Sequence, residues 1–141
     1  TEKINEAIDI YEKAVAVNPS FWVALNNLAF LLAEHKPSRL DRALELAQQA
    51  LEIRPDGPEV MDTVGWVFMK KGDFDNARAM INKALDKSPE SPILNYHMAK
   101  IHYMDKRFVE AKGNLEKALS ENKPFSGKDD AKALLAQLTN N

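Results

Sequence analysis

The chain contains no cysteine and only five glycines among its 141 residues. The lack of cysteine excludes a disulfide framework, a zinc–cysteine site and a thiol nucleophile. No glycines fall into the spacing of a phosphate-binding loop, and no Gly-x-Ser-x-Gly nucleophile elbow occurs. Because the sequence shows no catalytic motif, we expect no enzymatic activity and no catalytic residue.

A surplus of basic charge and long apolar runs are also missing. Lys and Arg number 19 against 21 Asp and Glu, a formal net charge of −2 that does not favour binding to phosphate backbones. The longest apolar run, residues 21–33, is interrupted by two asparagines and is too short to cross a bilayer. We therefore expect neither a nucleic-acid partner nor membrane insertion by this segment.

The histidines are not spaced as metal ligands. His97 and His102 are five residues apart on a predicted helix. Their side chains therefore point roughly 140° apart, since an α-helix advances by about 100° per residue. Zinc-binding helices instead place two histidines at positions i and i+4. We expect no metal site and no cofactor.

What the sequence does contain is an internal repeat. Alanines recur every 34 residues in two series, Ala43, Ala77 and Ala111, and Ala50, Ala84 and Ala118. Prolines recur at intervals of 36 and 34 residues, at Pro19, Pro55 and Pro89. A fixed period of this length indicates an array of helical repeats.

Each repeat is predicted to form two helices. In the middle repeat, the first helix is expected over residues 58–71 and the second over residues 74–87. Pro58 suits the first turn of a helix, Gly72 suits a C-cap, and Asp73 suits an N-cap. The helices of each repeat would therefore be joined by a short turn.

The pattern resembles the tetratricopeptide repeat, which places small residues at its eighth, twentieth and twenty-seventh positions. The eighth positions here are Ala29, Gly65 and Ala99. The resemblance implies an all-α, right-handed α-solenoid of helix-turn-helix repeats, closed by a C-terminal capping helix. It also explains Gly65, because a small residue lets adjacent helices approach and offsets a helix-propensity cost of about 1 kcal/mol.

The repeat boundaries follow from this register. The predicted units are residues 1–19, the second helix of a truncated repeat; 20–56, a repeat with a two-residue turn insertion; 57–90 and 91–122, two further repeats; and 125–141, the capping helix. Pro37 would interrupt the first complete repeat, where Ser38 can cap the next helix, and Ser126 is a candidate N-cap of the capping helix. In the first helix, Ile4, Ile8 and Val15 are expected to be partly uncovered.

The first helix of each pair lines the concave face in the tetratricopeptide family. The resemblance therefore implies that a partner contacts Asn26, Asn27, Phe30, Asp62, Thr63, Trp66, Met69, Lys70, Tyr96, His97, Lys100 and Tyr103. Asn27 could bond a peptide backbone, and Trp66 is turned by about 100° from Gly65 toward the groove. The alternative is that Phe30, Trp66 and Tyr103 pack against one another between repeats.

Some members of the family bind a C-terminal carboxylate through Lys and Arg in the groove. The corresponding positions here are Asn26, Phe30, Thr63, Ile93 and His97, and none of them is basic. An extended segment or a helix with apolar anchors is therefore the better candidate ligand.

The predicted function is a non-catalytic scaffold that binds a protein or peptide, as a fragment of a longer bacterial protein. The runs Asp62–Trp66 and Asn95–Ala99 are similar to runs in bacterial tetratricopeptide proteins of exopolysaccharide and exosortase-type systems. The alternatives are a recruitment arm of a larger enzyme such as a glycosyltransferase, or self-association through the uncovered N-terminal helix. The compartment stays open between the bacterial cell envelope and the cytoplasm.

Overall fold

The computed structural model describes residues 1–140, which form eight α-helices and one short 3-10 helix and contain no strand. The elements are α1 (Glu2–Val17), α2 (Trp22–His35), η1 (Pro37–Arg39), α3 (Leu40–Ile53), α4 (Pro58–Lys70), α5 (Phe74–Lys87), α6 (Pro92–Met104), α7 (Phe108–Leu119) and α8 (Lys128–Thr139). The all-α prediction is confirmed for this part of the chain. The predicted end of the capping helix, residue 141, lies outside the described residues.

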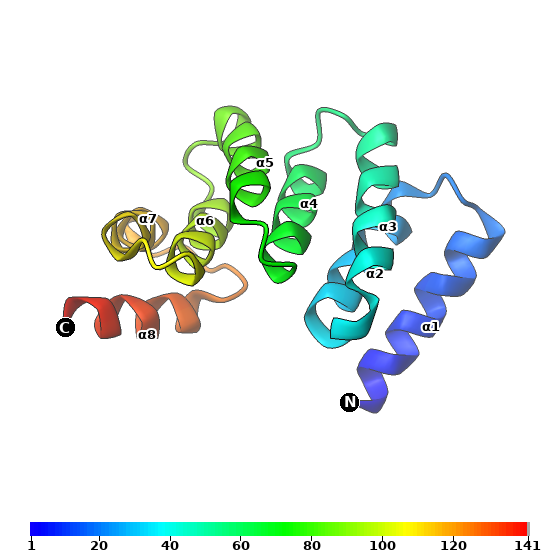
Figure 1. Cartoon of the computed structure of the whole chain (residues 1–141), viewed down its shortest axis with the longest axis horizontal. Helices are drawn as coiled ribbons and strands as arrows, with labels where there is room; N and C mark the ends of the chain where they lie inside the picture. Colours follow the sequence, from blue (N-terminus) through cyan, green and yellow to red (C-terminus); the bar gives the residue numbers. More distant parts are fainter. Residues whose placement is uncertain (141) are drawn as a thin grey trace.

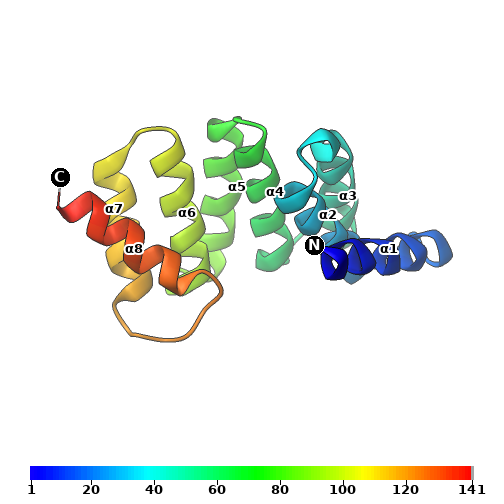
Figure 2. The same cartoon turned by 90° about the horizontal axis from the view of Figure 1, so that it is seen from below.

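The helices form a linear array of pairs. Helix α2 packs most extensively against α3, α4 against α5, and α6 against α7, and each pair contacts the next. The pairs follow one another along the longest axis of the molecule, with α1 at one end and α8 at the other (Figure 1). From below, α8 runs along the last pair, and it packs on α7 (Figure 2). The fold is thus an α-solenoid of helical repeats.

Three clusters of buried side chains hold the array together, and the smallest joins α4, α5 and α6 around Leu94. The largest extends from Ile8 in α1 to Ile101 in α6. The second joins α6, α7 and α8 through residues such as Leu115 and Leu134. Because each helix buries its apolar face against its neighbours, the core runs along the array rather than filling a single centre.

The close approach of α4 to α5 explains the glycine in the interior of α4. A Cβ atom on Gly65 would lie 2.7 Å from Cδ1 of Ile81 and 3.2 Å from the backbone oxygen of Ala77. Ala29 and Ala99, at the equivalent positions of the other repeats, are fully buried. The prediction that a small residue is needed at this crossing is confirmed.

Local signals set the limits of the second helix pair. The Asp73 side chain accepts a hydrogen bond from the backbone N–H of Asn76 at 3.2 Å, so it is the predicted N-cap. Gly72 has a φ of +81°, the left-handed conformation that suits a glycine at a helix end. Pro58 occupies the first turn of α4, where a missing N–H leaves no hydrogen bond unmade.

Two predicted N-caps are wrong. Ser38 lies inside the 3-10 helix η1, and Arg39 flanks the start of α3 without a side-chain cap. Ser126 precedes Gly127, which is the residue that flanks α8 and has a φ of +92°. In both places the turn geometry, and not a serine hydroxyl, sets where the helix starts.

The first helix is better covered than the sequence predicts. Ile8 is buried in the main cluster, so the expectation that it is partly uncovered is wrong, whereas Ile4 and Val15 are partly buried beside it. The exposed apolar residues of α1 are instead Ile10 and Val17. Helix α2 covers the side of α1 that carries Ile8 and leaves the opposite side open.

Candidate functional site

The predicted site residues all lie on α2, α4 and α6, which pack side by side along the array. We call the surface that these three helices present the inner face. Within each helix, the predicted residues fall on the same side because residues three or four positions apart share one side of a helix. Several of these side chains form hydrogen bonds or ion pairs within the chain, so they are not free groups lining an empty groove.

A stack of rings crosses the inner face. The ring centroids of Phe30 and Trp66 are 6.3 Å apart, and those of Trp66 and His97 are 4.3 Å apart. The stack continues from His97 to Tyr96 at 5.6 Å and from Tyr96 to Phe125 at 5.9 Å. Aromatic rings at such distances attract one another, so the stack ties three repeats and the segment before α8 together.

Trp66 lies within this stack and is only 6% exposed. Its indole Nε1–H donates a hydrogen bond to the Glu34 carboxylate, and the Lys70 ammonium lies 5.5 Å from its ring centroid. Lys70 also pairs with Glu34 at 3.4 Å. The structure therefore places Trp66 as a packing residue between neighbouring repeats, with little surface left for a partner.

Polar side chains on α4 are also engaged within the chain. His97 Nδ1 lies 2.7 Å from the carboxylate of Asp62, and both groups are largely buried. The Thr63 hydroxyl donates to the backbone oxygen of Glu59 at 3.2 Å. Met69 is buried in the main cluster. The side chains of Asp62, Thr63, His97 and Met69 therefore mainly make contacts within the chain.

The candidate residues on α6 are held by α8. The Tyr96 hydroxyl donates to the Asp130 carboxylate at 2.5 Å, and Lys100 donates to the same group at 3.3 Å. The Tyr103 hydroxyl accepts a hydrogen bond from the Gln137 amide at 3.2 Å. A partner could reach these three side chains only by competing with α8.

The same contacts shift two pKa values. Burial raises the pKa of the Tyr96 phenol, and its hydrogen bond to the negative Asp130 raises it further. That bond also lowers the pKa of Asp130, with a smaller contribution from the positive charge of Lys100. Tyr96 is therefore a neutral donor and Asp130 an ionised acceptor near neutral pH.

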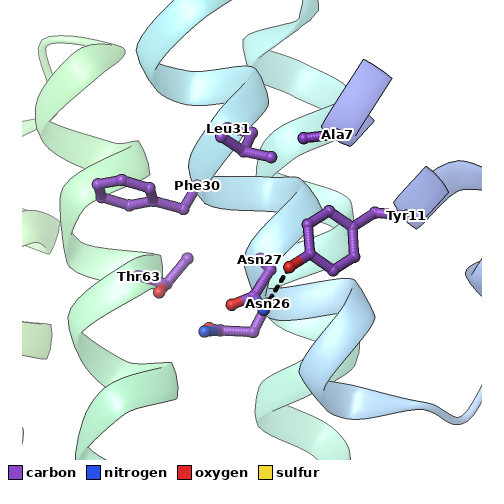
Figure 3. Close-up of a pocket in the computed structure, with 7 residues that line it drawn as sticks. All are labelled: Ala7, Tyr11, Asn26, Asn27, Phe30, Leu31 and Thr63. Carbon is purple, nitrogen blue, oxygen red and sulfur yellow. Dashed lines mark hydrogen bonds between the residues drawn. The ribbon is translucent and has the colours of Figure 1, made fainter. Parts of the chain in front are cut away.

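The inner face is open at its N-terminal end, where α1, α2 and α4 meet. A hollow of about 340 Å³ there is lined by Ala7, Tyr11, Asn26, Asn27, Phe30, Leu31 and Thr63 (Figure 3). The apolar groups of Ala7, Phe30 and Leu31 form one part of its wall, and amide and hydroxyl groups form the other. The structure thus brings four predicted site residues together in one cavity.

Hydrogen-bonding groups in the hollow are partly unused. The amide nitrogen of Asn27 donates to the Tyr11 hydroxyl at 3.2 Å, which leaves the carbonyl oxygen of the Asn27 side chain facing the hollow (Figure 3). The side-chain oxygen of Asn26 is buried and has no hydrogen-bond partner among the described residues. Buried polar atoms are normally satisfied, so the Asn26 oxygen is an exception among the described residues.

Helix α1 contributes to this site through Ala7 and Tyr11, which were not among the predicted site residues. Tyr11 stands one repeat before Ala47, Ile81 and Leu115, which are all fully buried apolar residues. A tyrosine in that series puts a hydroxyl where the other repeats have only hydrocarbon. This departure from the repeat was the signal that could have identified Tyr11 as a site residue.

Residues 1–140 contain neither a metal-binding cluster nor a membrane-spanning helix. No three His, Asp or Glu side chains in this range are grouped closely enough to hold a metal ion. No described helix is both long enough and apolar enough to cross a membrane.

The chain matches models of a known family along most of its length. Two models described as tetratricopeptide repeat match residues 1–58 and residues 68–138. Among curated proteins, it is 27% identical over 113 residues to Protein O-mannosyl-transferase TMTC1 of Homo sapiens, covering 79% of this chain and 13% of that protein. It is also 30% identical over 79 residues to a TPR repeat-containing protein of Pseudomonas aeruginosa, covering 56% and 13%. The chain thus spans only a small part of either curated relative.

Solved structures share the fold. A thermophilic TPR protein of Thermus thermophilus superposes with a TM-score of 0.80 at 22% identity, covering 98% of this chain and 74% of that one. The type III secretion chaperone SycD of Yersinia enterocolitica, in complex with a peptide of the translocator YopD, gives a TM-score of 0.67 at 18% identity, covering 82% and 89%. At these identities, the likeness concerns the arrangement of the helices.

Proposed function

Since the chain belongs to the tetratricopeptide repeat family, we propose that it is a non-catalytic scaffold that binds a peptide or protein segment on its inner face. Arrays of this family are protein–protein interaction modules, because stacked helix pairs present an extended surface. The observation that carries the proposal is the hollow between α1, α2 and α4, with its unpaired Asn26 oxygen.

The hollow has the chemistry to hold an extended peptide. A backbone amide of the ligand needs one acceptor and one donor. The side-chain oxygen of Asn27 can accept from its N–H, and the amide group of Asn26 can donate to its C=O. An apolar side chain of the ligand would lie against Phe30 and Leu31 and lose its contact with water.

Support for a peptide ligand also comes from a protein of the same fold. The SycD structure with a similar helix arrangement contains a peptide of its translocator YopD. We place the ligand of this chain at the α1–α2–α4 end, because α8 already engages Tyr96, Lys100 and Tyr103 at the other end.

The proposal is tested by selecting a ligand and then removing one side of the hollow. A phage-displayed library of random linear peptides is selected on the immobilised chain, and enriched peptides are measured by fluorescence polarisation. We expect Asn26→Ala and Phe30→Ala each to weaken the selected peptides about tenfold or more. Glu116→Ala, at an exposed position of α7, is the control and leaves binding unchanged.

Folding and binding are separated by melting curves. Asn26→Ala removes an unpaired oxygen, so it is expected to melt no lower than the parent chain. If no peptide is enriched, or if the enriched peptides bind both variants as tightly as the parent, the proposed site is wrong.

A second candidate function is a recruitment arm of a larger enzyme such as a glycosyltransferase, within a longer bacterial protein. The matched segment takes up only 13% of the O-mannosyl-transferase relative, which favours this alternative. The complete reading frame tests it. A transferase domain on the same polypeptide would support the recruitment arm, and a reading frame without one would exclude it.

A further inference from the structure

A second cavity, separate from the hollow, opens between α4 and α6. It has a volume of about 350 Å³. Its wall is formed by Pro58, Glu59, Asp62, Ser88, Ser91, Ile93 and Leu94. Further helices lie on both sides of α4 and α6 along the array (Figure 1), so this cavity is an internal feature of the array. We call it the α4–α6 cavity.

The apolar part of the cavity wall is fixed by the core. Leu94 is only 4% exposed and belongs to the cluster of buried side chains that joins α4, α5 and α6. Ile93 packs against the same cluster, and Pro58 lies in the first turn of α4. The methylene groups of a long side chain can lie along these residues and lose their contact with water.

The polar part of the wall carries negative charge. Glu59 and Asp62 are three residues apart on α4, so their carboxylates lie on one side of the helix. At the position of Glu59, the neighbouring repeats hold Val23 and Ile93, and neither neighbour is acidic at the position of Asp62. The charge therefore belongs to this cavity and is not a general property of the repeat.

Contacts within the chain leave part of each carboxylate available. The Asp62 side chain is 13% exposed, and among the described residues only its Oδ1 atom is hydrogen-bonded, to His97 Nδ1 at 2.7 Å. The Glu59 side chain is 48% exposed, and its Oε1 atom lies 3.5 Å from a guanidinium nitrogen of Arg54. An ion pair between side chains this exposed contributes little. One oxygen of each carboxylate can therefore accept hydrogen bonds from a ligand.

The helix ends at the cavity do not cancel this charge. The first turns of α4 and α6 both contribute to the wall. A helix N-terminus carries about half a positive charge, so two ends supply roughly one. The two carboxylates exceed that amount, and the cavity therefore favours a cation over an anion.

Two other kinds of ligand fit the cavity less well. A metal ion would need further protein ligands, because no three His, Asp or Glu side chains of residues 1–140 are grouped closely enough to hold one. A wholly apolar side chain would cover the carboxylates without pairing them, which costs free energy. A long cationic side chain suits both parts of the wall, because its stem is apolar and its head is charged.

We propose that the α4–α6 cavity receives an arginine or lysine side chain of the protein segment that binds this chain. The stem of that side chain lies along Pro58 and Ile93, and its head donates hydrogen bonds to Glu59 and Asp62. Arginine fits best, because a guanidinium has five N–H donors and can bond both carboxylates at once. The inference rests on the proposed function only in taking the ligand to be a protein segment.

A direct titration tests the cavity without a selected ligand. The probe is a blocked pentapeptide with one arginine among four alanines, and the comparison peptide carries glutamine instead of arginine. Two-dimensional NMR of the isotopically labelled chain follows the backbone amides. The amides of residues 59–62 and 93–94 are expected to shift saturably with the arginine peptide, at roughly millimolar affinity, and not with the glutamine peptide. Added salt should weaken the binding, because it screens partly exposed ion pairs.

Removing one charge at a time provides the second test. Glu59→Gln keeps the shape of the side chain, and we expect it to weaken the arginine peptide about threefold or more. Asp62→Asn keeps an oxygen facing His97 and should weaken the peptide about tenfold, because Asp62 is the more buried of the two. Glu52→Gln, at an exposed position of α3 outside the cavity, is the matched control and leaves the titration unchanged. Melting curves show whether each variant is folded, and Glu59→Gln decides alone if Asp62→Asn melts lower.

The outcomes separate this proposal from the proposed function. No saturable shift of these amides, equal shifts with the glutamine peptide, or an unchanged affinity in Glu59→Gln would each overturn the assignment of the cavity. Library peptides that bind through Asn26 and Phe30 would then still support the proposed function. Conversely, a saturable arginine titration beside a library that enriches nothing would support the cavity and contradict the site between α1, α2 and α4.

Discussion

At the scale of single residues, the two glycines inside helices have opposite surroundings. Gly65 in α4 faces Ile81 so closely that an added Cβ would overlap it. Gly113 in α7 is exposed and has nothing within 4 Å of an added Cβ. At both positions, glycine makes the helix less stable than alanine would, by about 1 kcal/mol. Only at Gly65 does close packing leave no room for a larger residue.

We therefore expect alanine to act in opposite directions at these positions. Gly113→Ala should raise the free energy of unfolding by about 1 kcal/mol, whereas Gly65→Ala should lower it by about 1–2 kcal/mol through overpacking. Ile81→Val removes the nearest atom, so it should recover part of the loss in the double variant. Urea denaturation measures all three, and additive effects of Gly65→Ala and Ile81→Val would contradict this explanation.

His102 gives the stability a pH dependence. Its Nδ1 is buried without a partner among the described residues, and burial lowers its pKa below 6.5, with nearby Arg78 adding to the effect. The unfolded chain therefore binds a proton at a higher pH than the folded chain. This contribution to stability is complete above pH 6.5 and is lost as the pH falls below that value.

Denaturation on both sides of this pH tests the assignment. His102→Phe removes the titrating group, so its free energy of unfolding should fall less on mild acidification than that of the parent chain. An equal fall in both chains would mean that His102 does not account for the pH dependence.

At the scale of elements, the start of α8 packs closely against α6 at Gly127. Gly127 has a φ of +92°, and an added Cβ would overlap the ring of Tyr96. Because Gly127 has no side chain, the Tyr96 ring lies close to the backbone there, and its hydroxyl donates a hydrogen bond to Asp130 on the first turn of α8. The start of α8 thus depends on a residue of α6 and cannot be read from its own local sequence.

Gly127→Ala is expected to loosen α8. The left-handed conformation alone costs an alanine about 1–2 kcal/mol, and the Tyr96 ring must also move. Gly72→Ala is the matched control, because Gly72 has a φ of +81° but nothing within 4 Å of an added Cβ. Hydrogen exchange should show faster exchange of the α8 amides in Gly127→Ala than any change that Gly72→Ala causes near its own turn. Equal effects would exclude a role for the Tyr96 contact.

The same contrast explains which elements could be predicted from the sequence. The limits of α5 follow from signals within a few residues, such as Asp73 and Gly72. Ser126 was wrong as an N-cap because the geometry before α8 is set by Tyr96, which is distant in the sequence. Helix periodicity likewise placed Trp66 on the correct side of α4, but its burial depends on Glu34 and His97 from neighbouring repeats.

At the scale of the whole molecule, the two larger clusters of buried side chains lie in different parts of the array. One joins α1 to α6, and the other joins α6 to α8. The repeat period predicted this stacking, because a helix pair cannot bury its apolar face alone. It could not predict where the inner face is open, since that depends on α8 covering the α6 end and on α1 lining the hollow at the other end.

The stack of rings also couples the hollow to the fluorescence of Trp66. Phe30 lines the hollow on one side and contacts Trp66 on the other, so a ligand in the hollow changes the surroundings of an indole it does not touch. The second tryptophan, Trp22, lies apart from the stack under Arg54. In a Trp22→Phe background, Trp66 is the single tryptophan. Its fluorescence, excited at wavelengths that tyrosine does not absorb, would follow occupancy of the hollow without any label.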